Sequence, residues 1–347
     1  MRMLFRCDAS DVIGTGHVVR CLALAVGLRS HAVDAFFVCA DQPGNMSRAI
    51  SAHGFPLRLI RPCSTEWDDA QATIEAVTDA QPFDWLVVDS YLLGHRFEQY
   101  LHRSIGRILV IDDLHDRRHL CDLLVDASAV EDDIGRYASL VAPSTICLLG
   151  QKYAPLRRAF VDVAREDRDF TRVRRVLVSY GGTDPLDMTS KAIVVAGNAA
   201  VRHIQFDVVI GLTNPRRRRL QARAKHLPNA IIHVDTPCMP ELMARSDLSL
   251  GAGGTTTWER MFMGLPSIVV SVADNQFETC EWLASTGLIR YLGFGNHVTA
   301  EDLHEALLAA AEDHGWRVKV SALGGQLVDG LGVRRIIEAM TRISAPL

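Results

Sequence analysis

The chain has 347 residues, enough for about two domains that each bury a core of their own. Apolar residues make up 48% and charged residues 22%, which is typical of a folded globular protein and excludes a disordered tail, a collagen-like rod or a coiled coil. The 37 Lys and Arg against 41 Asp and Glu give a net charge of −4, so no overall positive field favours a nucleic-acid partner.

The apolar runs of the sequence are short. Leu265–Val272 falls well below the roughly 20 residues that cross a bilayer, and Asp8 interrupts the N-terminal stretch before an apolar segment of signal-peptide length develops. The eight cysteines include no C-x-x-C pair, which argues against a zinc site and against a disulfide framework. We therefore expect a cytoplasmic protein whose cysteines are mostly reduced core residues, with no membrane association.

The first half of the chain alternates strand-length apolar runs with helix-length stretches. The predicted strands are Met3–Cys7, Ala35–Ala40, Trp85–Asp89 and Ile108–Asp112. A run with helical periodicity extends from His17 to about Leu28, directly after a glycine-rich turn. This alternation predicts a parallel sheet covered by helices, and ligands of such sheets bind at the carboxyl ends of the strands.

The same pattern restarts in the second half. The predicted strands there are Arg175–Tyr180, Phe206–Ile210, Ile231–Val234, Leu248–Leu250 and Ser267–Val272. The charged stretch Ala164–Arg172 between the two series is typical of an exposed interdomain connection, so we predict domains at 1–164 and 165–347. A helical apolar stripe in Gly330–Met340 could pack on either domain.

The segment Asp8–Arg20 places a histidine beside the glycines of a turn. Gly14 and Gly16 allow a ligand to approach the backbone closely. The N-terminus of a helix carries a partial positive charge, which disfavours protonation of the His17 ring. His17 is therefore a candidate neutral base near pH 7. The alternative is a helix cap or a hydrogen-bonded core histidine.

Leu250–Glu259 has the same order of elements: a predicted strand is followed by a turn of small residues and then by a helix. Main-chain donors and the hydroxyls of Thr255 and Thr256 could hold a pyrophosphate, and Glu259 could accept hydrogen bonds from ribose hydroxyls. The segment lacks the Gly-Lys-Ser/Thr ending of a Walker loop. The alternative is a capping box with glycines that merely close the helix onto the sheet.

Other polar turns follow predicted strands. Tyr180–Pro185 is a second glycine turn at the same sheet edge, or an ordinary turn. Ile111–Asp116 has the composition of a metal site, but its carboxylates crowd into one loop, so polar substrate contacts or a capped turn are favoured. Asp89–Tyr91 and Asp274–Gln276 could face a cleft or form turns, and the basic run Arg216–Arg219 is more often a solvated helix face than a nucleic-acid site.

Two enzyme classes are disfavoured by missing motifs. No Gly-x-Ser-x-Gly elbow suggests an α/β hydrolase, and the Gly-x-Gly-x-x-Gly fingerprint with its acidic ribose partner is absent, which disfavours hydride transfer.

The order of these motifs resembles that of a known family. The opening pattern is Arg6-x-Asp8-x-Ser10 followed by Ile13-Gly14-x-Gly16-His17-x-x-Arg20-Cys21-Leu22-x-Leu24-Ala25. Further matching positions are Asp89-x-Tyr91, Asp112-Asp113, Cys121-Asp122-Leu123-Leu124, Gly150-x-x-Tyr153-x-x-Leu156-Arg157, Gly181-Gly182-Thr183-Asp184, Glu259 and Asn275-Gln276. Over nearly its whole length the chain resembles the UDP-sugar hydrolases of pseudaminic acid biosynthesis, which are relatives of the MurG-like glycosyltransferases.

The resemblance implies a GT-B fold, with two Rossmann-like doubly wound α/β domains and an interdomain cleft. The N-terminal domain would bind the sugar and carry the catalytic groups, and the C-terminal domain would bind UDP. The implied reaction releases UDP from UDP-2,4-diacetamido-2,4,6-trideoxy-β-L-altropyranose by inverting, metal-independent attack of water at the anomeric carbon. The alternatives are a GT-B glycosyltransferase and a hydrolase of another UDP-amino sugar.

Residue roles follow from the matching positions. The implied catalytic residues are His17, Tyr91 and Asn275, and the implied substrate-binding residues are Gly14, Gly16, Arg20, Asp89, Asp112 and Asp113. The implied UDP-binding residues are Gly181, Gly182, Thr183, Gly253, Gly254, Thr255, Thr256, Glu259 and Gln276. No metal or cofactor is expected, the partners are the UDP-linked amino sugar and the UDP product, and we expect a monomer.

Overall fold

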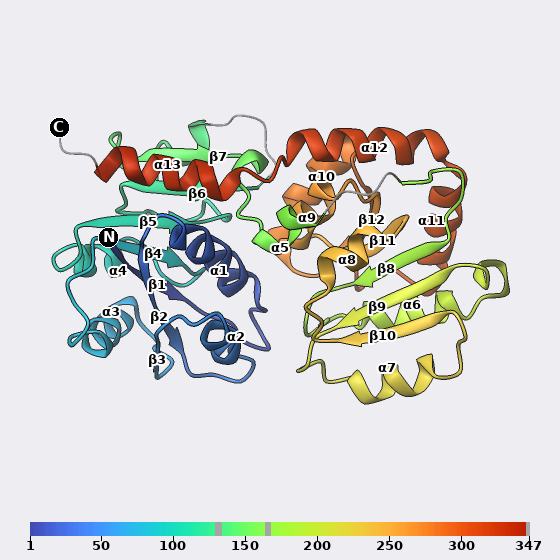
Figure 1. Cartoon of the computed structure of the whole chain (residues 1–347), viewed down its shortest axis with the longest axis horizontal. Helices are drawn as coiled ribbons and strands as arrows, with labels where there is room; N and C mark the ends of the chain where they lie inside the picture. The colour runs from blue at the N-terminus through green and yellow to red at the C-terminus, as the bar shows by residue number, and fades with distance from the viewer. Residues whose placement is uncertain (129–133, 164–167, 345–347) are drawn as a thin grey trace. The chain divides into compact units, whose positions relative to one another are not determined.

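A computed structural model describes residues 1–128, 134–163 and 168–344 of the chain. The chain divides into two compact units, one formed by Met1–Arg158 with Gly330–Leu347 and the other by Ala159–Asp329 (Figure 1). The second unit thus begins six residues before the start expected from the charged stretch.

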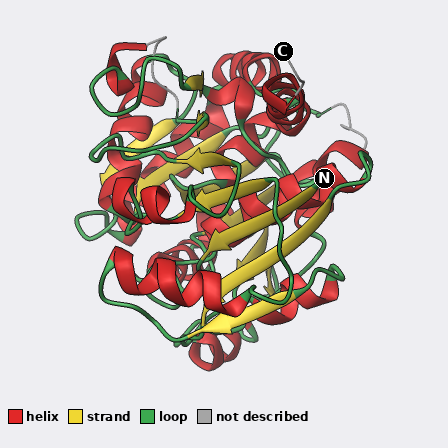
Figure 2. Ribbon diagram, turned by 90° about the vertical axis from the view of Figure 1, so that its left-hand side faces the viewer, coloured by secondary structure: helices red, strands yellow, loops and turns green. Residues whose placement is uncertain are grey.

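The first unit is built on a seven-stranded parallel sheet with the order β3-β2-β1-β4-β5-β6-β7. Its strands are β1 (Arg2–Cys7), β2 (Asp34–Ala40), β3 (Leu57–Ile60), β4 (Trp85–Asp89), β5 (Arg107–Ile111), β6 (Leu123–Asp126) and β7 (Ile146–Leu149). Its helices are α1 (Gly16–Arg29), α2 (Ser47–Ala52), α3 (Glu66–Ala76), α4 (His95–Leu101), η1 (Ile134–Tyr137), η2 (Gln151–Tyr153) and α13 (Gly332–Ser344), and α5 (Arg158–Asp162) spans the boundary. Figure 2 shows the strands as a layer between helices.

The second unit repeats the plan with a six-stranded parallel sheet of order β10-β9-β8-β11-β12-β13. Its strands are β8 (Arg175–Ser179), β9 (Gln205–Ile210), β10 (Ala230–Val234), β11 (Leu248–Ala252), β12 (Ser267–Ser271) and β13 (Arg290–Phe294). Its helices are α6 (Met188–Ala196), η3 (Ala199–Val201), α7 (Arg217–Ala224), α8 (Met239–Ala244), α9 (Thr256–Phe262), η4 (Asp274–Gln276), α10 (Phe277–Ser285), α11 (Ala300–Glu312) and α12 (His314–Leu327). The two parallel α/β sheets predicted from the sequence are confirmed.

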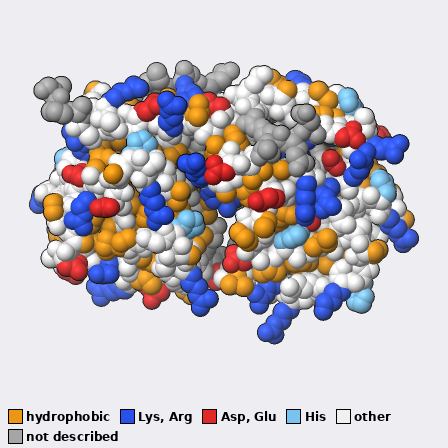
Figure 3. Space-filling view, viewed as in Figure 1, with side chains coloured by type: hydrophobic (Ala, Val, Ile, Leu, Met, Phe, Trp, Pro, Cys, Tyr) orange, Lys and Arg blue, Asp and Glu red, His pale blue; other side chains and the backbone are white. Residues whose placement is uncertain are grey.

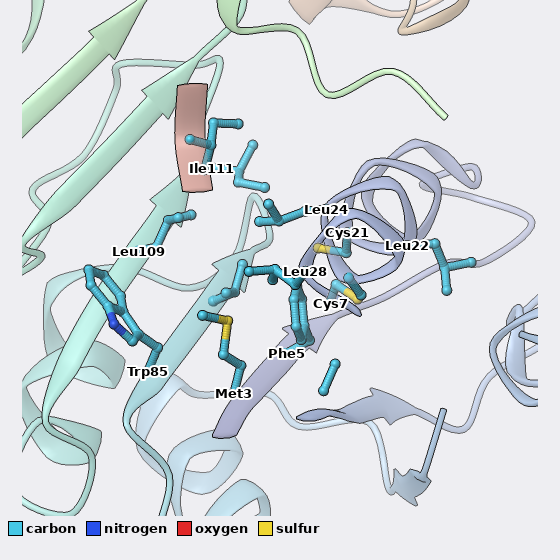
Figure 4. Packing of buried hydrophobic residues seen from close by; sticks show 14 of the residues in the cluster. Met3, Phe5, Cys7, Cys21, Leu22, Leu24, Leu28, Trp85, Leu109 and Ile111 are labelled. Carbon is cyan, nitrogen blue, oxygen red and sulfur yellow. The ribbon is translucent and has the colours of Figure 1, made fainter. Parts of the chain in front are cut away.

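Both faces of the first sheet are buried, which explains its nearly continuous apolar strands. Met3 and Phe5 of β1 pack toward Leu24 and Leu28 of α1 (Figure 4). Alternate residues such as Leu4 turn to the other face, where α3 and α4 supply the partners. The bounds of β1 and α1 lie within one residue of the ranges expected from the sequence.

The C-terminal helix α13 belongs to the first unit, although the sequence-based boundary assigned it to the second. Its apolar stripe, which includes Ile336 and Met340, is buried in the core that contains α1 and β1 (Figure 1). A Cβ added at Gly27 of α1 would lie 2.4 Å from a methyl of Val333, so the two helices can approach this closely only with glycine at position 27. The apolar periodicity of Gly330–Met340 predicts a buried helix face, but it does not show which of the two domains the helix packs against.

Candidate functional site

The loop between β1 and α1 is shaped by hydrogen bonds of its own polar residues. The Ser10 hydroxyl accepts hydrogen bonds from the backbone N–H groups of Val12 and Ile13, and the Ser10 and Gly14 backbones bond to each other in both directions. Gly14 has a φ of 78°, and a Cβ added there would meet no atom within 4 Å. Glycine is therefore favoured at this position by its left-handed backbone conformation and not by a lack of room for a side chain. The loop ends in Gly16, the first residue of α1, and places His17 in the first helical turn.

His17 is paired with the carboxylate at the end of β4. Its Nδ1 lies 2.5 Å from Asp89 Oδ1, and both side chains are buried. Since β1 and β4 are neighbours with Cys7 opposite Asp89, two residues that are 72 positions apart meet at one sheet edge. Among the described residues His17 Nε2 has no hydrogen-bond partner, and Nε2 is not one of the fully enclosed polar atoms. An ionised Asp89 fixes the proton of a neutral ring on Nδ1 and leaves Nε2 as a proton acceptor.

Arg20, one turn along α1, completes this pair. It donates from Nε to Asp89 Oδ2 at 2.6 Å and from Nη2 to Asp89 Oδ1 at 2.7 Å, which is a bidentate ion pair in a buried setting. Burial by itself would raise the pKa of the Asp89 carboxyl, but Arg20 and His17 lower it to about 2. The carboxylate therefore stays ionised at neutral pH, and both of its oxygens are occupied by protein donors.

A thiol adds a further donor to Asp89. Cys21 Sγ lies 3.7 Å from Asp89 Oδ2, and burial raises the pKa of this thiol to about 11, so it remains protonated and can donate. Cys7 of β1 lies next to Cys21 of α1 in the core of the first unit (Figure 4). Cys21 belongs to the same sequence motif as His17, but its contact with Asp89 is visible only in the fold.

Tyr91 and Asp113 extend the network to the loops after β4 and β5. Arg20 Nη1 lies 2.9 Å from Asp113 Oδ2, and the Tyr91 hydroxyl donates to the same oxygen at 3.3 Å. The Tyr91 ring meets the His17 ring edge to face with centroids 4.3 Å apart. Burial and the nearby Asp113 carboxylate raise the pKa of Tyr91, so the hydroxyl keeps its proton. Of the predicted first-domain set, His17, Arg20, Asp89, Tyr91 and Asp113 thus form one cluster.

Asp112 contacts a different set of groups. Its Oδ2 accepts hydrogen bonds from the Tyr137 hydroxyl at 3.0 Å and from the His115 backbone N–H at 2.9 Å, so the capped turn considered from sequence is present. Arg117, which the sequence did not single out, lies 3.0 Å from Asp112 Oδ1 and donates to the Ser90 carbonyl at 2.7 Å. Arg117 therefore ties the loop that carries Tyr91 to the loop that carries Asp113.

In the second unit, glycine-rich loops follow the adjacent strands β8 and β11. Gly251 of β11 pairs with Ser179 of β8, so the two loops leave the same edge of the sheet. Gly181 has a φ of 89°, and a Cβ added at Gly181 or Gly182 would meet no atom within 4 Å. Asp184, after Thr183, accepts hydrogen bonds from the backbone N–H groups of Met188 and Thr189, which caps the start of α6.

The loop after β11 is packed tightly on one side. A Cβ added at Gly253 would lie 2.3 Å from Cys280 Sγ and 3.2 Å from Gln276 Cβ, and Gly254 faces the Gln276 amide. Gln276 Oε1 also accepts a hydrogen bond from the Val272 backbone N–H at 3.0 Å. The predicted UDP-binding residues after β8, β11 and β12 are thus drawn from neighbouring strands.

The start of α9 does not form the capping box considered as an alternative. Thr255 occupies the N-cap position and its side chain makes no capping hydrogen bond. Glu259 lies in the first turn of α9 and is 5% exposed. Asn275 lies in η4, which follows β12 in the second unit, so the predicted catalytic set draws on both units.

Arg260 is a functional candidate that the sequence analysis missed. Its side chain is fully buried and donates to the Ala252 carbonyl at 2.8 Å and to the Thr257 hydroxyl at 3.0 Å. Arg260 stands beside Glu259 in a short helix that also carries two threonines, so the sequence there is typical of a partly exposed helix. Periodicity gave no indication that this charge is buried.

The basic run Arg216–Arg219 is partly structural. Arg216 donates to the Asp184 carbonyl at 3.1 Å and lies 3.3 Å from Asp187, whereas Arg218 and Arg219 are exposed on α7. In Figure 3 basic side chains are interspersed with acidic and apolar ones over the visible face. None of the described helices combines the length and apolar character of a bilayer-spanning segment, and the described residues include no group of three or more His, Cys, Asp or Glu that could hold a metal ion.

Two parallel Rossmann-like sheets of seven and six strands define a GT-B fold. The solved structure of MurG from Acinetobacter baumannii matches this chain with a TM-score of 0.66 at 12% identity, covering 98% of this chain and 99% of that one.

Two further sequences are distant relatives. The spore coat polysaccharide biosynthesis protein SpsG of Bacillus subtilis is 25% identical over 335 residues, 93% of each chain. The UDP-2,4-diacetamido-2,4,6-trideoxy-β-L-altropyranose hydrolase of Campylobacter jejuni is 25% identical over 288 residues, 83% of this chain and 97% of its own. No family model matches the chain.

Proposed function

We propose that this protein is a nucleotide-sugar hydrolase that releases UDP from UDP-2,4-diacetamido-2,4,6-trideoxy-β-L-altropyranose. The observation that carries the proposal is the buried His17–Asp89 pair, which leaves Nε2 as the ring nitrogen able to accept a proton. The distant relationship to the Campylobacter jejuni hydrolase over most of both chains supports this choice of reaction and substrate.

The proposed reaction is a single displacement at the anomeric carbon. The oxygen of a water molecule forms a bond to that carbon while its proton passes to His17 Nε2. The bond from the carbon to the β-phosphate oxygen breaks, its electron pair goes to the diphosphate, and the sugar leaves with inverted configuration. The Asp89 carboxylate stabilises the imidazolium through Nδ1–H, and Arg20 holds Asp89 ionised and in place.

A diphosphate is a competent leaving group, so this reaction does not need a second carboxylic acid to protonate an alkoxide. It needs donors for the charge that grows on the diphosphate. We assign this task to the second unit, where Gly254, Thr255 and Thr256 offer main-chain and hydroxyl donors. The Gly253 N–H already donates to the Val270 carbonyl, so Gly253 would serve by letting the loop pack closely against Cys280. Gly181, Gly182 and Thr183 line the same sheet edge, and Gln276 holds the loop. Glu259 would accept hydrogen bonds from the ribose.

The remaining assignments concern the sugar. Tyr91, whose ring lies against His17, would line the sugar pocket, and Asn275 would contact the sugar or its phosphate. Gly14 and Gly16 would allow the sugar to approach the loop backbone, while Asp113 and Asp112 would hold the surrounding loops. Under this proposal the first unit binds the sugar and the second unit binds UDP.

Proton NMR of the protein with this substrate in D₂O containing EDTA tests the proposal. We expect UDP to appear without an acceptor and the first free-sugar signal to have the inverted configuration. Retention of configuration, or a requirement for added metal, would contradict the mechanism. If UDP is released only when an acceptor alcohol is supplied and the sugar is found on that acceptor, the protein is a glycosyltransferase, which the fold also accommodates.

A further inference from the structure

Arg260 is a buried cation without a carboxylate partner. The residue is 1% exposed, and among the described residues no carboxylate oxygen lies within 4.0 Å of its guanidinium. Its Nε has no hydrogen-bond partner there either. Buried charges in proteins are normally paired, because transferring a charged group from water into the protein interior without a counter-ion costs free energy. The neighbouring Glu259 carboxylate raises the pKa of Arg260 through space, but no ion pair within 4.0 Å joins the two side chains.

The hydrogen bonds that Arg260 does make all go to the turn after β11. Nη2 donates to the Ala252 carbonyl at 2.8 Å and to the Thr257 hydroxyl at 3.0 Å, and Nη1 donates to the Thr256 hydroxyl at 3.4 Å. A Cβ added at Gly251 would lie 2.3 Å from Nη1, so the guanidinium occupies the space that a side chain at 251 would need. The turn Ala252–Thr257 is therefore held around a fixed positive charge.

Burial lowers the pKa of Arg260 to about 10, so the group is still protonated at neutral pH. A charge in a low-dielectric interior that is not held in a direct ion pair acts over several ångströms. Gly254, Thr255 and Thr256 are the partly exposed residues of this turn, and their backbone N–H groups and hydroxyls suit an anion.

We propose that Arg260 is a positioning residue for the diphosphate of the nucleotide ligand, fixing the donors of the turn Ala252–Thr257 and supplying, from beneath it, the charge that the diphosphate neutralises. The inference rests on the proposed function, because it requires a diphosphate at this turn. It adds that the affinity of the second unit for the charged part of the ligand depends on a residue that does not touch the ligand.

Calorimetry and ligand-observed NMR with the full chain can distinguish loss of the Arg260 charge from a general disturbance of the nucleotide site. We expect Arg260→Gln to weaken binding of UDP by about 10- to 100-fold and to leave binding of uridine within about twofold. Arg260→Lys, which keeps the charge but not the fork, should retain most of the UDP affinity. The matched control is Arg219→Gln, which makes the same change at an exposed position of α7.

If Arg260→Gln binds UDP as tightly as the wild type, or loses UDP and uridine equally, the inference is wrong. Should Arg260→Gln fail to fold, ³¹P titration of UDP bound to the wild-type protein and to Arg260→Lys decides the matter. The pKa of the terminal phosphate must be lower in both complexes than in free UDP, and a terminal phosphate that titrates as in free UDP overturns the inference. A wild-type chain that binds neither UDP nor inorganic pyrophosphate would instead refute the proposed function.

Discussion

The two candidate sites occupy equivalent sheet edges but are built in different ways. In the first unit, polar and charged side chains bond to one another: Asp89 is matched by Arg20 and His17, and Asp113 Oδ2 accepts from Arg20 and Tyr91, while Asp113 Oδ1 has no hydrogen-bond partner among the described residues. In the second unit, the loops offer main-chain donors and small residues, and the Arg260 guanidinium beneath the turn forms no ion pair within 4.0 Å among the described residues. Under the proposed function, the first arrangement transfers a proton, whereas the second binds an anion supplied by the ligand.

The largest expected effect concerns the proton. His17→Asn removes Nε2 as base and should lower kcat for UDP release by about 10³- to 10⁴-fold. The affinity for UDP should stay within about twofold, because the nucleotide is assigned to the other unit. Steady-state kinetics and calorimetry check this pair of values. Turnover within tenfold of the wild type would refute His17 as the base.

Asp89→Asn tests whether the carboxylate acts through His17. The amide nitrogen of Asn can donate to Nδ1, which would move the ring proton to Nε2 and remove the acceptor. We expect kcat to fall by about 10²- to 10³-fold with KM changed much less. ¹⁵N NMR of the histidine ring should show the change of tautomer; an unchanged tautomer with full loss of activity would contradict this role.

Two glycine variants probe the second unit. Gly253→Ala forces a Cβ to within 2.3 Å of Cys280 Sγ, so the loop must shift and UDP affinity should fall by about tenfold or more. Gly182→Ala meets no protein atom within 4 Å, so its thermal stability should match the wild type. A drop in UDP affinity for Gly182→Ala would therefore report direct approach of the ligand to that backbone. Equal UDP affinity of the wild type and Gly253→Ala would argue against a nucleotide at this loop.

The smallest expected effect is on acid stability. The Asp89 carboxyl has a pKa of about 2 in the folded chain, below its ordinary 3.8, so its ionisation stabilises the fold above about pH 4 and this contribution is lost as the pH falls toward 2. A shift of this size corresponds to about 2 kcal/mol. Urea unfolding should show that the difference in the free energy of unfolding between the wild type and Asp89→Asn decreases as the pH falls through this window. A gap that does not narrow would show that Asp89 is not ionised against Arg20.

The sequence predicted the repeated α/β pattern and the position of the glycine turns, because both depend on local periodicity and turn chemistry. It did not predict the short strands such as β3 and β6, whose four residues are too few to establish a period. It named Asp89 without pairing it to His17, because that contact depends on β1 and β4 being neighbours. Arg260 was missed because burial of a charge is decided by packing around Gly251 and has no local signature.

The return of α13 to the first unit has a consequence for how the chain is made. The residues that complete the packing around Gly27 and Phe5 are synthesised only after the whole of Ala159–Asp329. On the ribosome the second unit can therefore finish folding before the first one does, while α1 still has an uncovered apolar face. A fragment that stops at residue 158 would keep this face exposed, so the first unit should be expressed separately only with residues 330–347 joined to it.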